Sequence, residues 1–149
     1  GITYGTKAIN ADVATASRTF MPISDQYFSD DITPALAYGP YVWMAPCDGK
    51  FIKIRAKMES AAGNSFFKMY TVTAAPGGTI GDPLAGSDTG LSGATVTNTV
   101  SVSANTAHTF TFSNATFSAG DIIALSFDGT NMPNQMIASL IIEYDWSTV

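Results

Sequence analysis

The fold class is decided by one stretch of the chain, Phe51-Ile52-Lys53-Ile54-Arg55-Ala56-Lys57-Met58. Its apolar and basic side chains alternate, and successive side chains of a β-strand point to opposite faces of a sheet. One face of this strand is therefore expected to lie in a core and to carry Ile52, Ile54, Ala56 and Met58. The other face is expected to lie in water and to carry Lys53, Arg55 and Lys57.

Further runs rich in β-branched and aromatic residues predict additional strands. They cover residues 41–44, 66–73, 96–102, 109–112, 122–127 and 136–144. Glycine-containing turns separate the runs, and no apolar stripe with helical spacing is sustained. We therefore expect an all-β fold, an antiparallel two-sheet β-sandwich with the jelly roll as its leading topology. An immunoglobulin-type sandwich is the alternative, although Cys47 has no second cysteine with which to form that fold's core pair.

Residues 1–40 differ from the rest and are expected to form an N-terminal arm with extended excursions, followed by a sandwich domain over residues 41–149. Apolar residues are scattered through the arm and must be buried against its own domain or against a neighbour. Those predicted to bind a partner are Ile2, Tyr4, Ile9, Val13, Phe20, Tyr27 and Phe28. Residues 75–95 are too rich in glycine for a regular element, and we expect an exposed loop that either carries contacts or is a mobile insertion without a role.

Composition excludes several functional classes. A chain of 149 residues that is 46% hydrophobic and 13% charged is long enough for one domain with a packed core, and it is not disordered. A net charge of −5 disfavours nucleic acid as a partner, because phosphate binding needs a positive field. No apolar run reaches the ~18 residues of a membrane-spanning helix, so no membrane contact is expected.

Catalysis is not expected from this sequence. His108 is the only histidine, it lies in an alternating run, and no nucleophile-elbow, phosphate-loop or zinc-protease motif is present. A hydrolase that uses paired carboxylates is harder to exclude. Acidic loop residues lack the spacing of a calcium loop, and we expect neither a metal nor a cofactor. The acidic residues considered are Asp30, Asp31, Asp82, Asp88 and Asp128.

Two groups of residues are candidates for binding. Lys53, Arg55 and Lys57 predict a contact face for an acidic protein surface or an anionic glycan, with a solvated strand face as the alternative. Tyr41 and Trp43 share one face of a short predicted strand, where exposed rings could contact a ligand. The alternative for Trp43 is a place in the core, since its neighbours are apolar.

Two segments carry a family resemblance. The segment Val42-Trp43-Met44-Ala45-Pro46-Cys47-Asp48-Gly49-Lys50-Phe51-Ile52-Lys53-Ile54 resembles the opening of small β-sandwich proteins of tailed-phage virions. The segment Phe117-Ser118-Ala119-Gly120-Asp121-Ile122-Ile123-Ala124-Leu125-Ser126-Phe127 resembles the corner before their final strand. A similar Gly-Asp corner occurs in the trimeric jelly rolls of the tumour necrosis factor and complement type.

The resemblance implies a non-enzymatic virion structural protein, and the length of the chain favours a capsid decoration, or cement, protein. Such a protein would form a homotrimer, bind the major capsid protein or another virion protein through the arm, and stabilise the head. It would be made in the host cytoplasm and end on the capsid surface. The alternative is a receptor- or glycan-binding module of a phage tail or head fibre.

Overall fold

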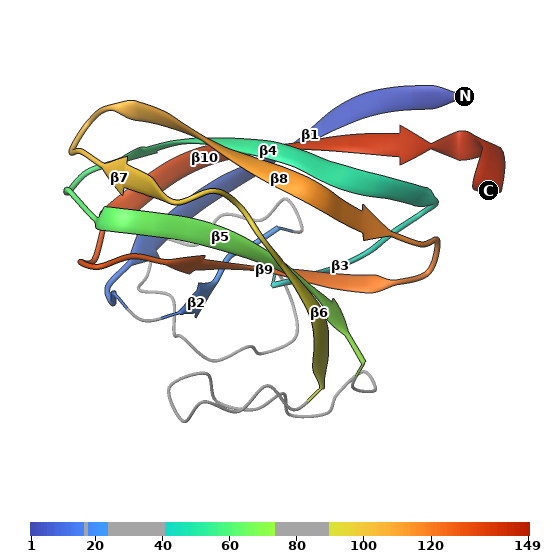
Figure 1. Cartoon of the computed structure of the whole chain (residues 1–149), viewed down its shortest axis with the longest axis horizontal. Helices are drawn as coiled ribbons and strands as arrows, with labels where there is room; N and C mark the ends of the chain where they lie inside the picture. Colours follow the sequence, from blue (N-terminus) through green and yellow to red (C-terminus); the bar gives the residue numbers. More distant parts are fainter. Residues whose placement is uncertain (17, 24–40, 74–89) are drawn as a thin grey trace.

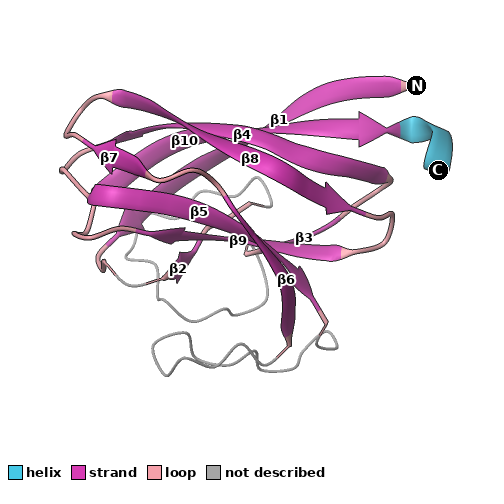
Figure 2. Ribbon diagram, viewed as in Figure 1, coloured by secondary structure: helices cyan, strands magenta, loops and turns pink. Residues whose placement is uncertain are grey.

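Two antiparallel sheets pack face to face in the computed structural model, which describes residues 1–16, 18–23, 41–73 and 90–149 (Figure 1). Among these residues, strands supply nearly all of the regular structure, and a single 3-10 turn at Trp146–Thr148 follows the last strand (Figure 2). The predicted all-β, two-sheet sandwich is confirmed.

The first sheet, called sheet A below, contains four long strands. Their order is β1 (Ile2–Val13), β10 (Asn134–Asp145), β4 (Asp48–Met58) and β8 (Ala107–Phe117). All three pairings are antiparallel. The first and last strands of the chain therefore lie side by side, with Ile2 opposite Asp145 and Val13 opposite Asn134.

The second sheet, called sheet B, is built on β9 (Ile122–Asp128) and β5 (Gly63–Val72), which pair with each other. Two short strands, β2 (Thr19–Phe20) and β3 (Val42–Met44), share the outer side of β9. Two more, β6 (Leu91–Val96) and β7 (Val100–Val102), share the outer side of β5. Each sheet thus has four strand positions, which is the eight-position arrangement of the expected jelly roll.

The core lies between the sheets and is made of alternate residues of the long strands. Aromatic rings fill much of it, with the ring of Phe67 in sheet B packed 4.9 Å from that of Phe110 in sheet A and 5.2 Å from that of Phe127. The alternation predicted for residues 51–58 needs one correction. The pairing of β4 with both neighbours shifts at Ile52, so that Phe51, rather than Ile52, is buried with Ile54. A β-bulge of this kind moves the preceding side chain to the other face.

The structure also corrects the expected division at residue 40. Residues 2–13 are not an arm outside the sandwich, because β1 pairs with β10 along its whole length. Ile9, Val13 and Phe20 are fully buried in the chain's own core, so they are not available to a partner. Removal of the first thirty residues would take away β1 and β2 and would not leave the domain folded.

Two further expectations concern segments that the structure describes only in part or not at all. Tyr27 and Phe28 lie outside the described residues. Of the predicted loop over 75–95, residues 75–89 also lie outside them, while Leu91–Val96 forms β6. Gly93 fits into this strand with a positive φ of 63°, a conformation that glycine adopts without strain.

Gly49 is the position at which sheet A tolerates no side chain. A Cβ there would overlap the carbonyl oxygen of Glu143 and would lie 2.8 Å from Cζ of Phe117. We expect Gly49→Ala to lower the free energy of unfolding by about 1–3 kcal/mol, the usual cost of overpacking, as measured by chemical denaturation. Gly1→Ala, whose Cβ meets nothing within 4 Å, is the control and should leave stability unchanged. An unaffected Gly49→Ala variant would show that β4 and β10 do not pack as closely as described.

Candidate functional site

The two segments that carry the family resemblance meet at one corner of the sandwich, which we call the corner clamp (residues 45–49 and 118–121). The backbone N–H of Ala45 donates to the carbonyl of Asp121, and the N–H of Gly120 donates to the carbonyl of Ala45, both at 2.8 Å. The Asp48 carboxylate accepts from the N–H of Ala119 at 2.8 Å. The clamp therefore joins the β3–β4 connection to the β8–β9 connection, and both of these pass from one sheet to the other.

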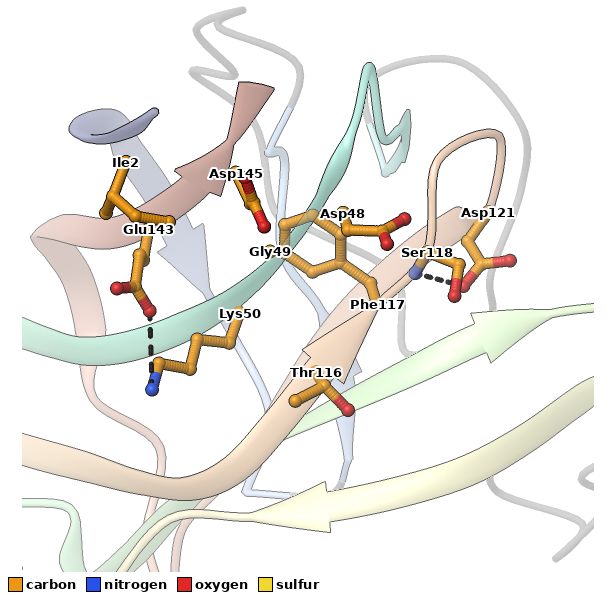
Figure 3. Close-up of a pocket in the computed structure, with 10 residues that line it drawn as sticks. All are labelled: Ile2, Asp48, Gly49, Lys50, Thr116, Phe117, Ser118, Asp121, Glu143 and Asp145. Atoms are coloured by element: carbon orange, nitrogen blue, oxygen red, sulfur yellow. Dashed lines mark hydrogen bonds and ion pairs between the residues drawn. The ribbon is translucent and has the colours of Figure 1, made fainter. Parts of the chain in front are cut away.

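A cavity of about 460 Å³ opens beside this clamp (Figure 3). It lies at the end of sheet A where the chain begins and ends, and acidic side chains dominate its lining. The lining residues are Ile2, Asp48, Gly49, Lys50, Thr116, Phe117, Ser118, Asp121, Glu143 and Asp145.

Each carboxylate in this cavity already has a partner in the fold. Asp121 Oδ2 accepts from the N–H of Ser118 at 2.8 Å, and Glu143 forms an ion pair with Lys50 at 3.3 Å. Asp145 accepts hydrogen bonds from the hydroxyl and the N–H of Ser147, and these bonds lower the pKa of its carboxyl. A general acid needs a carboxyl whose pKa is raised towards neutrality. The contacts of Asp145 instead favour its ionised form, which suits turn stabilisation better than proton transfer.

Trp43 lies at the edge of the core. Its ring packs edge-to-face on Phe117 at 5.4 Å and on Tyr144 at 6.1 Å, and the Lys7 ammonium lies 5.2 Å from its centroid. Tyr41 is only 8% exposed. The predicted exposure of the Tyr41 ring is therefore wrong, whereas Trp43 is half-buried and its contact with a ligand stays a prediction.

Lys53, Arg55 and Lys57 do lie together on the outer face of sheet A, and this row is open to solvent along much of its length. Arg55 Nη1 donates to Thr109 Oγ1 at 3.3 Å across the β4–β8 pair. On the other side, the register of β10 places one residue beside each member of the row. These neighbours, in the order Lys53, Arg55, Lys57, are Ile141, Ser139 and Ile137.

Two apolar residues of this outer face are exposed, of which Tyr4 was predicted from the sequence to bind a partner and Ile137 was not. Ile137 is 65% exposed beside Lys57, and Tyr4, which was assigned to the arm, is 67% exposed on β1 of the same sheet. The signal for Ile137 is the alternation in residues 136–144, which places this isoleucine on the face opposite Met136 and Ala138. A cavity of about 400 Å³ lies next to Ile137, lined by Lys57, Met58, Glu59, Asn105, Gln135 and Ile137.

His108 has a structural partner. Its Nε2 accepts from the N–H of Ser103 at 3.0 Å, so the ring ties the start of β8 to the residue that follows β7. Of the acidic loop residues considered as metal ligands, Asp30, Asp31, Asp82 and Asp88 lie outside the described residues. Within the residues that are described, no three His, Cys, Asp or Glu side chains are grouped to hold a metal ion. No helix in this part of the chain is long and apolar enough to cross a membrane.

Comparison with known proteins identifies no family. No family model and no curated protein matches the chain. Among solved structures, a chain of infectious bursal disease virus, Gx strain, is 10% identical over 96% of this chain, with a TM-score of 0.46, and this chain spans about a third (32%) of it. A Bacillus endospore appendage protein from disulfide-linked pili is 12% identical, with coverage of 96% of this chain and 87% of that chain and a TM-score of 0.38.

A third similar structure holds the CBM22-1 and GH10 modules of Clostridium thermocellum xylanase 10B in complex with xylohexaose. It is 11% identical over 94% of this chain and 26% of that chain, with a TM-score of 0.39. At these values the likeness is one of β-sandwich architecture and assigns no function. The tailed-phage relationship suggested by the sequence motifs stays a prediction.

Asp128, at the end of β9, is the described carboxyl that the fold disfavours in its charged form. Burial raises its pKa, and Lys68 and Arg18 offset this only in part. Oδ2 of Asp128 has no hydrogen-bond partner. The folded state therefore binds the proton of this carboxyl more tightly than the unfolded state does. Above the raised pKa the ionised carboxylate lowers the stability of the fold. This penalty shrinks as the pH falls through the raised pKa and is gone below the ordinary value of 3.8.

We therefore expect Asp128→Asn to increase stability at pH 7, with a gain that shrinks to nothing as the pH is lowered through the raised pKa. Thermal unfolding across this pH range measures the gain. Asp145→Asn is the control of opposite sign, because its lowered pKa means that the ionised form stabilises the fold at pH 7. A loss of stability in Asp128→Asn at pH 7 would show that the charges of Lys68 and Arg18 outweigh burial.

Proposed function

We propose that this chain is a non-catalytic virion structural protein, a capsid decoration protein that binds the major capsid protein and stabilises the head. The observation that carries the proposal is the outer face of sheet A, where Ile137 is exposed beside Lys57 of the basic row Lys53, Arg55 and Lys57, and Tyr4 is exposed on β1 of the same face, opposite Glu143. Exposed apolar side chains on the same face as a row of like charges are typical of a surface that another protein covers.

The sign of the charge indicates what kind of surface would cover this face. The chain carries a net charge of −5, yet three of its seven basic residues follow one another on the same face of β4. Like charges gathered on one face create a local potential that attracts the opposite sign. The proposed contact on the capsid is therefore an acidic region, and the cavity beside Ile137 offers room for a side chain of the partner.

The contacts of the acidic residues also favour a binding role over a hydrolytic one. The carboxylates beside the corner clamp hold turns and cross-strand pairs, which supports this preference. The fibre-module alternative relied on the loop over residues 75–95 together with Tyr41 and Trp43, and the burial of Tyr41 weakens its support.

Co-sedimentation tests the proposal. The probe is a preparation of heads assembled from the major capsid protein of the same virus without this chain, and the wild-type chain should co-sediment at a fixed ratio to coat protein. Arg55→Glu should weaken binding at least about tenfold, equivalent to about 1.4 kcal/mol, because it places a negative charge in the centre of the basic row. Ile137→Ser should weaken binding through loss of the apolar contact.

Lys68→Glu is the matched control, since it changes the net charge by the same amount but lies on sheet B. It should bind like the wild-type chain, provided that its melting temperature shows it folded, because Lys68 offsets part of the burial of Asp128. Equal losses for Arg55→Glu and Lys68→Glu would indicate that net charge, and not the outer face of sheet A, determines binding. No co-sedimentation of the folded wild-type chain would contradict the decoration role itself.

A further inference from the structure

The four edges of the two sheets differ in how regular they are. Both edges of sheet B are divided between two short strands, β2 with β3 and β6 with β7. At one of these breaks, the Thr97 hydroxyl takes the place of a backbone acceptor for the N–H of Phe67, at 3.0 Å. In sheet A, the edge strand β8 shifts register against β4 and contains Asn114 with a positive φ of 57°. Breaks and bulges of this kind prevent an edge from pairing with another strand.

The remaining edge, β1, has none of these interruptions. It pairs with β10 over twelve consecutive positions without a register shift, and among the described residues β10 is its only strand partner. Its sequence holds no proline, and its only charged residues are Lys7 and Asp12. A long, regular and weakly charged edge is a template for another strand.

Lys7 does not act as an edge-protecting charge. An inward-pointing lysine protects an edge when its ammonium must reach water past that edge. Lys7 is only 7% exposed, and its ammonium lies 5.2 Å from the centroid of the Trp43 ring inside the sandwich. The fold has already removed the Lys7 ammonium from water, so a strand added to β1 would not add to the cost of its desolvation.

We propose that β1 pairs antiparallel with β1 of a second copy of this chain, so that the two sheets A join into one sheet across a two-fold axis. A two-fold interface requires a strand that is complementary to itself. A register centred on Ala8 meets this condition. It places Ala8 opposite Ala8, Thr6 opposite Asn10, and Tyr4 opposite Asp12, and it sets no two like charges against each other.

The outward side chains of β1 at the centre of this register are small. Thr6, Ala8 and Asn10 are exposed residues that alternate with the buried Lys7 and Ile9. They leave room for a second strand at the ordinary spacing of about 4.8 Å. A two-fold axis perpendicular to the sheet also turns both outer faces, with both basic rows, to the same side.

This arrangement would give two-point attachment to an acidic surface, which strengthens binding without new contacts. The pairing itself rests on the edge of β1 and not on the proposed function, so the two are tested separately. Light scattering and sedimentation of the full chain measure the pairing, and co-sedimentation with heads measures the proposed capsid binding.

The wild-type chain should have a mass of about 31 kDa, twice the 15.6 kDa of one copy. Ala8→Lys should reduce it to one copy, because two ammonium groups would face each other at the centre of the interface. Ser139→Lys is the matched control, as it places the same charge on the neighbouring position of β10, one strand inside the edge, and it should keep the paired mass. An equimolar mixture of Ala8→Lys and Ala8→Glu should recover the paired mass.

A wild-type mass of one copy at all concentrations would overturn the proposal, and a mass of three copies would overturn it in favour of the expected trimer. A paired mass in both Ala8→Lys and Ser139→Lys would place the interface elsewhere. Because a variant could fail to fold, the circular dichroism spectrum and melting temperature of each are compared with those of the wild type. Ala8→Cys offers a second test, since oxidation should yield a disulfide-linked pair at a Cα separation within the range of a disulfide, whereas Ser139→Cys should not.

Discussion

The corner clamp is the constraint on which the rest of this structure depends. A sandwich has to carry its chain between two sheets, and here the β3–β4 and β8–β9 connections make that passage at the same corner. The reciprocal backbone bonds between Ala45 and the turn at Gly120 and Asp121 fix these connections to each other. The Asp48 carboxylate adds a charge-assisted bond to Ala119, of the stronger kind. Once this corner is set, the registers of β4, β8 and β9 follow.

The same constraint also bears on the binding face that we propose. The acidic residues near the clamp are occupied by turns and by Lys50, and the rings of Trp43 and Phe117 close the adjoining end of the core. The surface that we propose for recognition is the outer face of sheet A, which the described clamp residues orient but do not cover. Its basic row and its exposed Ile137 come from neighbouring strands in fixed register, so the spacing of charge and apolar surface is set by the sheet itself.

Local patterns in the sequence predict most of the strands but not their partners. Alternation was sufficient for residues 51–58 and 136–144, and it indicated the basic row. It failed for residues 2–13, where small and exposed residues such as Thr6 and Ala8 weaken the pattern and the pairing partner is β10, at the other end of the chain. The bulge at Ile52 has no signature in the local sequence. The two clamp segments were recognised separately as turns, but their contact joins residues about seventy positions apart, and no local pattern reports it.

A double-mutant cycle on Asp48 and Asp121 tests this account most directly. The two carboxylates accept from the neighbouring amides of Ala119 and Ser118, so removal of either should loosen the turn that holds the other. Chemical denaturation of Asp48→Ala, Asp121→Ala and the double variant should give a cost of roughly 1–2 kcal/mol for each single change. The double variant should then lose less than the sum, by at least about 0.5 kcal/mol. Costs that add within about 0.3 kcal/mol would mean that the two connections are held independently and that there is no single clamp.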